Sequence, residues 1–102
     1  MPYDKPLPRL YVDFNDMLAP DLVLLSRHDA KPDANGEMVH LSEGLEVAIF
    51  SDDLDDQGQP DNLVAVGVVE RNHDKGWSKA VKWCCRIGPE GIRHESDFRT
   101  NS

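Results

Sequence analysis

Residues 45–70 read LEVAIFSDDLDDQGQPDNLVAVGVVE and carry the clearest strand signal in this chain. Two runs rich in β-forming residues, Leu45–Phe50 and Leu63–Glu70, enclose an acidic segment, Ser51–Asn62. Valine and isoleucine favour strands, whereas the glycine and proline between the two runs favour a turn. We therefore predict a β-hairpin with a long acidic loop, and we expect shorter strands on either side to complete a sheet around it.

Shorter segments outside this hairpin also carry strand patterns. Apolar and polar residues alternate over Arg9–Phe14, and Leu22–Leu25 is a short apolar run of the kind found in buried strands. One helical turn is expected at Asn15–Leu18, and a loop is expected at residues 28–36. The remaining predicted strands are Glu37–Leu41, Trp77–Ile87 and Ile92–Ser96.

This pattern predicts an all-β protein, a small barrel or compact sandwich of six to seven short strands with at most one helical turn. In layout it is similar to SH3-like or OB-like barrels, a resemblance of strand number and length that implies no function. The 102 residues are expected to form one domain. Residues 1–8, which hold three of the seven prolines, predict an extended arm, and residues 97–102 predict a flexible tail.

The composition is that of a folded, acidic protein. The formal net charge of −8 argues against binding to nucleic acid or to an anionic membrane. The longest apolar run, Leu63–Val69, is too short to span a bilayer, and the N-terminal residues contain no apolar signal segment. The two cysteines are adjacent and provide no disulfide framework, so we expect a cytoplasmic protein with reduced thiols.

Acidic and basic residues are separated along the chain. Residues 1–70 contain 4 Lys and Arg against 15 Asp and Glu, whereas residues 71–102 contain 7 Lys and Arg against 4 Asp and Glu. The formal net charges of the two parts are therefore −11 and +3. Either the two parts attract one another within one small domain, or the basic part provides a functional surface.

The acidic loop has a spacing that resembles a calcium-binding loop. From Asp53 it reads D-x-D-x-Q-G-x-x-D, which is similar to the D-x-D-x-[DN]-G loops of EF-hands and thrombospondin type 3 repeats. Calcium takes oxygen ligands at alternate positions, and the glycine allows a sharp turn. The resemblance implies weak Ca²⁺ binding, with the ligands Asp53, Asp55, Gln57 and Asp61.

Two departures from that pattern leave another interpretation open. Gln57 replaces the usual Asp or Asn, and Val64 stands where an EF-hand places its bidentate Glu. The flanking segments are also predicted strands instead of helices. The alternative is a solvated hairpin loop without a cofactor, whose charges discourage aggregation.

A second candidate site depends on the register of a predicted C-terminal hairpin. With its tip at Pro89 and Glu90, Cys85 faces His94. The pair could act as the thiolate–imidazole nucleophile of a small thiol-dependent enzyme, or as two ligands of a soft metal. The alternative is a buried thiol packed against a hydrogen-bonded histidine. The chain contains no H-E-x-x-H, G-x-S-x-G or P-loop motif that would favour an enzyme.

The same register assigns side chains to two faces of the hairpin, since side chains alternate along a strand. The face expected to join the core consists of Trp83, Cys85, Ile87, Ile92 and His94. The face expected to be solvated and mostly basic consists of Lys82, Cys84, Arg86, Arg93 and Glu95.

The function that the sequence favours is a non-enzymatic binding or regulatory module that acts through protein–protein contacts. Lys82, Arg86 and Arg93 are the expected partner-binding residues, because a basic strand face could dock an acidic protein segment. The partner could also be the acidic loop of a second copy, which would give self-association that weakens with salt. Calcium binding and thiol catalysis remain the alternatives.

Overall fold

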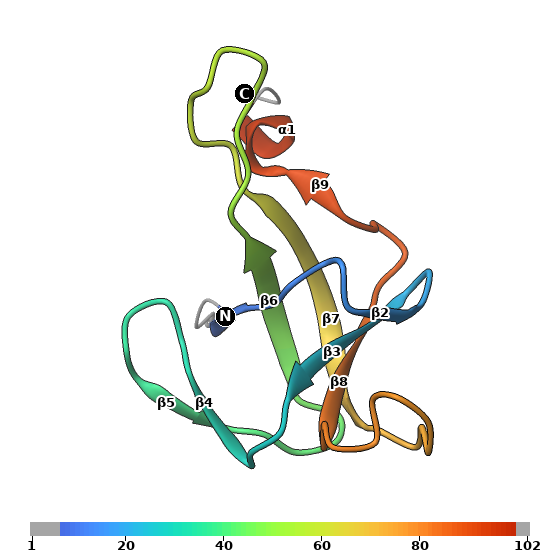
Figure 1. Cartoon of the computed structure of the whole chain (residues 1–102). Helices are drawn as coiled ribbons and strands as arrows, with labels where there is room; N and C mark the ends of the chain where they lie inside the picture. The colour runs from blue at the N-terminus through green and yellow to red at the C-terminus, as the bar shows by residue number, and fades with distance from the viewer. Residues whose placement is uncertain (1–6, 100–102) are drawn as a thin grey trace.

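The computed structural model of the chain describes residues 7–99, so most of the predicted arm and residues 100–102 of the predicted tail lie outside the described residues. The described part is mostly β, which confirms the predicted class (Figure 1). Its elements are β1 Arg9–Tyr11, β2 Met17–Ala19, β3 Leu22–Ser26, β4 Ala30–Pro32, β5 Met38–His40, β6 Glu46–Ser51, β7 Leu63–Arg71, β8 Trp83–Ile87, β9 Arg93–His94 and α1 Glu95–Arg99.

The predicted hairpin is confirmed and forms part of the main sheet. β6 pairs antiparallel with β7, from Glu46 opposite Val68 to Ser51 opposite Leu63. The strand order is β1-β6-β7-β8-β3-β2, with β9 paired to the beginning of β7. β1 runs parallel to β6, so the sheet is mixed. Strands β4 and β5 form a separate two-stranded sheet.

The described strands do not form a closed barrel, so the SH3-like or OB-like layout is not confirmed. β1 and β2 are the two edges of the strand order and do not pair with each other. Each has only three residues, and residues 12–16 connect them across the open side. Closure would require hydrogen-bonded pairing between these edges.

One face of the curved main sheet supplies the core. Alternate residues of β6, β7 and β8 are buried on this face, as expected for strands with one apolar side. Trp83, Cys85 and Ile87 belong to this cluster, as the sequence predicts. The other buried apolar residues of the cluster are Leu10, Val12, Val23, Leu25, Leu41, Val47, Ile49, Ala65 and Val69.

Three local predictions are wrong. Trp77–Lys82 belongs to the connection before β8, because hydrogen bonds among its turn-forming residues replace strand pairing. The helical turn expected at Asn15–Leu18 is absent, since Met17 pairs with Val23 as part of β2. The loop expected at residues 28–36 contains β4, which forms a hairpin with β5.

The C-terminal hairpin register is also wrong. β9 pairs with β7, with His94 opposite Leu63 and Arg93 opposite Val64. A helix, α1, begins at Glu95, where a strand was expected. Ser96 in its first turn donates its backbone N–H and its hydroxyl to the carboxylate of Asp61, at 2.9 and 2.8 Å. This carboxylate favours a helix start because it satisfies a free N–H group and lies near the positive end of the helix.

Gly67 allows β7 and β8 to approach closely. It lies on the inner side of β7, between Val47 of β6 and Ile87 of β8. A Cβ atom at this position would overlap the backbone carbonyl of Arg86 and lie 2.6 Å from the sulfur of Cys85. Glycine inside a strand weakens it, so its presence here is explained by this close approach.

We predict that Gly67→Ala lowers the free energy of unfolding by about 1–3 kcal/mol, the usual cost of overpacking a core. The backbone carbonyl of Arg86 cannot rotate away as a flexible side chain could. Urea unfolding followed by circular dichroism measures the change. Gly76→Ala is the matched control, since its added Cβ would lie 3.6 Å from the Asp74 carboxylate, an ordinary contact distance. Equal effects of the two substitutions would contradict this explanation.

Candidate functional site

The connection between β7 and β8, residues 72–82, is organised by its own polar side chains. The Asn72 backbone N–H donates to the Lys82 carbonyl at 2.9 Å and closes the base of the loop. The Asn72 side-chain amide donates to the carbonyls of Ser78 and Val81, each at 2.9 Å. The loop, which we call the Trp77 loop, therefore has a defined conformation without regular secondary structure.

Asp74 and Ser78 fix the middle of the Trp77 loop. The Asp74 carboxylate accepts the hydroxyl of Ser78 at 2.6 Å and its backbone N–H at 3.1 Å. Ser78 is only 2% exposed. The Ser78 hydroxyl, followed by the Ser78 N–H, holds the pKa of the Asp74 carboxyl below its ordinary value, because both donors stabilise the ionised form.

Trp77 projects from this fixed loop into solvent. Its exposed fraction is 70%, the largest among the exposed large apolar residues of the described chain. The second tryptophan, Trp83, is 4% exposed and belongs to the core. Exposure of a large aromatic side chain on an ordered loop is typical of a contact surface, because the loop loses little entropy on binding.

Trp77 lines a cleft of about 530 Å³. Tyr11 and Leu24 contribute to it from β1 and β3, and Lys31 contributes from β4. The lining also includes Arg27 and His28 after β3, and Asp13 and Asp16 between β1 and β2. The lining of the cleft therefore combines aromatic, basic and acidic side chains.

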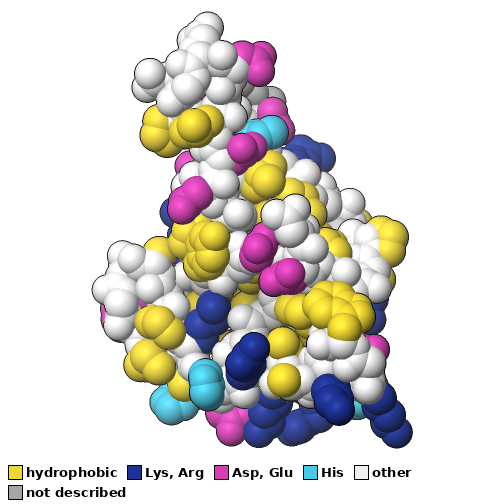
Figure 2. Space-filling view, in the orientation of Figure 1, with side chains coloured by type: hydrophobic (Ala, Val, Ile, Leu, Met, Phe, Trp, Pro, Cys, Tyr) yellow, Lys and Arg dark blue, Asp and Glu magenta, His cyan; other side chains and the backbone are white. Residues whose placement is uncertain are grey.

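The cleft and the Trp77 loop carry basic side chains that remain available. Arg27, Lys31, Lys75 and Lys79 form no salt bridge within residues 7–99. Partial burial lowers the pKa of Lys31. Figure 2 shows Lys and Arg side chains gathered at the lower end of the view, where Figure 1 places the Trp77 loop. An anionic group would be attracted to this end of the molecule.

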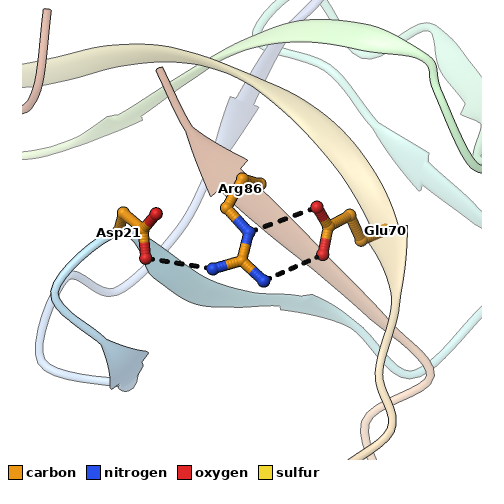
Figure 3. Close-up of polar contacts among 3 residues, drawn as sticks. All are labelled: Asp21, Glu70 and Arg86. Atoms are coloured by element: carbon orange, nitrogen blue, oxygen red, sulfur yellow. Dashed lines mark hydrogen bonds and ion pairs between the residues drawn. The ribbon is translucent and has the colours of Figure 1, made fainter. Parts of the chain in front are cut away.

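The basic residues expected to bind a partner have acidic partners within the chain. Arg86 of β8 binds both carboxylate oxygens of Glu70 on β7, at 3.2 Å each, and Asp21 at 3.0 Å (Figure 3). The Lys82 ammonium group lies 2.7 Å from the Asp29 carboxylate. These contacts join the basic and acidic parts of the sequence, so attraction between the two parts contributes to the fold.

Arg93 lies on a different strand from Lys82 and Arg86. Its guanidinium is 3.8 Å from the Glu90 carboxylate and also donates to the Glu90 carbonyl at 3.2 Å. Arg93 is opposite Val64 and Arg86 is opposite Val68 on β7. Four positions along a strand separate side chains by about 13 Å. A common partner-binding role for Lys82, Arg86 and Arg93 stays a prediction.

The residues expected to bind calcium have contacts of their own. The Asp53 carboxylate lies 2.8 Å from Nε2 of His94, and this contact raises the pKa of His94 and lowers that of Asp53. The Asp55 carboxylate accepts the backbone N–H groups of Gln57 and Gln59, each at 2.9 Å. The Asp61 carboxylate accepts the two hydrogen bonds from Ser96. Gln57 is exposed.

These contacts give the acidic loop a structural role at both of its ends. Within residues 7–99, no three His, Cys, Asp or Glu side chains gather closely enough to suggest a metal site. Calcium binding by the loop stays a prediction.

The structure does not bring Cys85 and His94 together. Cys85 is opposite Val69 of β7, whereas His94 is opposite Leu63, six positions earlier on that strand. Six positions correspond to about 20 Å. The expected core role of His94 and Ile92 is also wrong, since the His94 side chain is 43% exposed and Ile92 is 37% exposed.

Both thiols are buried, and the solvated position expected for Cys84 is wrong. Cys84 lies between Leu24 of β3 and Glu70 of β7, and its short side chain is fully covered there. Burial raises the pKa of Cys84 to about 11 and that of Cys85 to about 12. Both side chains are therefore protonated thiols near neutral pH, and a thiol is a much weaker nucleophile than a thiolate.

Comparison with protein-family models, with curated proteins and with solved structures finds no match for this chain. Within residues 7–99, no helix has the length and apolar character needed to cross a membrane.

The sequence prediction missed the Trp77 loop. Trp77 and Val81 are good strand formers and led to the prediction of a strand over residues 77–87. The opposing signal was present in Asn72, Asp74 and Ser78, which are residue types that bind nearby backbone groups in turns. The cleft beside Trp77 gave no sequence signal, since its walls come from distant segments.

We predict that the Ser78 amide resonance titrates with a midpoint below 3.8, the ordinary pKa of Asp. A lowered folded-state pKa means that the stabilisation by Asp74 is complete above the ordinary pKa. It is lost as the pH falls through the lowered value. Nuclear magnetic resonance over an acid titration measures the midpoint. Asp74→Asn should abolish the transition, and a midpoint at or above 3.8 in the wild type would overturn the assignment.

We also predict that neither cysteine reacts with a thiol reagent in the folded protein at pH near 8, because the raised pKa values leave little thiolate. Reaction should begin only when urea unfolds the chain. The rate of absorbance change with a disulfide reagent measures this, and the variants Cys84→Ser and Cys85→Ser separate the two sites. Fast reaction of Cys85 in the folded state would restore the enzyme hypothesis.

Proposed function

We propose that this protein is a non-enzymatic binding module that holds an acidic segment of a protein partner against the Trp77 loop. The observation that carries the proposal is the 70% exposure of Trp77 on a loop fixed by Asn72, Asp74 and Ser78. Tryptophan is among the residues that most often dominate protein–protein binding energy. An ordered loop that already presents it pays little conformational entropy on binding.

Charge favours an acidic partner. Lys75 and Lys79 lie two positions before and after Trp77, and Arg27 and Lys31 line the adjoining cleft. None of these four has a salt-bridge partner in the described part of the chain. Carboxylates of a partner would approach these cations without displacing an internal acidic group.

Acidic residues in the cleft lining set a direction for the partner. Asp13 and Asp16 line the cleft and would repel carboxylates. An acidic segment is therefore best placed with its apolar residue against Trp77 and its carboxylates toward Lys75 and Lys79. The buried, protonated thiols support a role without covalent chemistry.

We predict that acidic peptides with one central leucine or phenylalanine bind the wild type, and that binding weakens with salt. Trp77→Ala should weaken it about 30-fold, equivalent to about 2 kcal/mol, as for a central interface residue. A fluorescence-anisotropy screen of labelled acidic and basic peptides measures both effects. Met38→Ala is the matched control, since Met38 is an apolar residue with 58% exposure on β5 and lies outside the cleft lining.

Two further double variants test the charges around the cleft in the same screen. Lys75→Glu with Lys79→Glu should weaken the binding of acidic peptides. Asp13→Asn with Asp16→Asn should strengthen it, because the repelling carboxylates of the cleft lining are removed. Binding that is unchanged in Trp77→Ala would contradict the proposal. Tighter binding of a single-stranded oligonucleotide than of any acidic peptide would also contradict it, since an exposed tryptophan beside lysines can stack on bases.

A further inference from the structure

We infer that the occupant of the Trp77 cleft is the acidic loop, residues 52–62, of a second copy of this chain. The inference rests on the proposed function, because it names the partner of the same site. It follows from the apolar and charged groups on this loop and from its position on the molecule.

The acidic loop presents an apolar side chain among carboxylates. Leu54 is 61% exposed. Asp52 and Asp53 precede it, and Asp55 and Asp56 follow it. Asp52 and Asp56 form no salt bridge with any residue the structure describes. This composition matches the partner expected for the Trp77 loop, an apolar anchor with flanking negative charge.

The acidic loop is also ordered before any contact. Leu54 and Pro60 form an isolated β-bridge, and Asp55 fixes the turn between them through two backbone N–H groups. Asp53, near the start of the loop, contacts His94, and Asp61, near its end, accepts a hydrogen bond from Ser96. Leu54 is therefore presented by a formed loop, and binding needs little further ordering.

The two surfaces lie at opposite ends of the molecule. Figure 1 shows the loop between β6 and β7 at the top of the view and the Trp77 loop at the bottom. The donor and acceptor surfaces are thus different patches, and one copy cannot fill its own cleft. The contact between copies is heterologous, and repeated contacts form a ring or an open chain.

Charge complementarity favours this arrangement. Asp52 and Asp56 approach Lys75 and Lys79 of the next copy, and Leu54 packs against Trp77. The contact is small, because one loop tip enters one cleft, so the association is weak and transient. Salt weakens it, since the pairs are solvent-exposed.

Complementation between two variants tests this contact. One variant, Trp77→Ala, has a broken cleft and an intact acidic loop. The other, Leu54→Ser with Asp52→Asn and Asp56→Asn, has a broken loop surface and an intact cleft, and it keeps the structural residues Asp53, Asp55 and Asp61. Each variant alone should sediment as a monomer at low salt. An equimolar mixture should form a one-to-one dimer and nothing larger, because only one working contact remains.

The wild type should form larger species at low salt that dissociate at high salt. A peptide of residues 51–62 should bind the wild type and dissociate these species. Light scattering and sedimentation velocity over a concentration series measure both effects. Nuclear magnetic resonance of each variant verifies its fold, so loss of association can be assigned to the contact.

The outcomes separate the two proposals. A wild type that stays monomeric at low salt, together with a peptide of residues 51–62 that does not bind, overturns the self-association. If other acidic peptides still bind through Trp77 in the screen, the proposed function stands. If they fail as well, both proposals fall. A mixture of variants that stays monomeric while the wild type associates overturns the assignment of the contact to these two loops.

Discussion

The close approach at Gly67 is the constraint on which the rest of the sheet depends. β7 pairs with β6, β8 and β9, so its geometry positions three other strands. Where β7 passes β8, the carbonyl of Arg86 and the sulfur of Cys85 occupy the space that a side chain would need. Beside this point Cys85 belongs to the core, and Glu70 of β7 accepts a hydrogen bond from Arg86 of β8.

The Arg86 contacts explain what the charge separation of the sequence does. Arg86 and Lys82 come from the basic part of the chain, and their partners Asp21, Glu70 and Asp29 come from the acidic part. These two basic side chains are therefore neutralised by acidic residues of neighbouring segments. Among the side chains of residues 7–99 that form no salt bridge, Lys75 and Lys79 flank Trp77, whereas Asp52 and Asp56 flank Leu54.

The sequence predicted structure where the deciding contacts are local. The β6–β7 hairpin and the buried strand β3 were found because their apolar residues are consecutive or alternate. The position of β9 was missed because a tight turn at Pro89 favoured pairing with β8. The contacts that fix the observed arrangement join His94 to Asp53 and Ser96 to Asp61, 41 and 35 residues apart. The cleft beside Trp77 was missed for the same reason.

The strand order also has a consequence for how the chain acquires its structure. β3 receives its partner β8 only after about 60 further residues, since Val23 pairs with Cys85. β1 likewise can pair only after β6 has been synthesised, since Leu10 pairs with Ile49. During synthesis the apolar residues of β3 therefore emerge long before the strand that will cover them, whereas β6 and β7 can pair early. β3 and its neighbour β2 are therefore expected to join the sheet only after β8 has formed, and to be exposed to misassociation before that step.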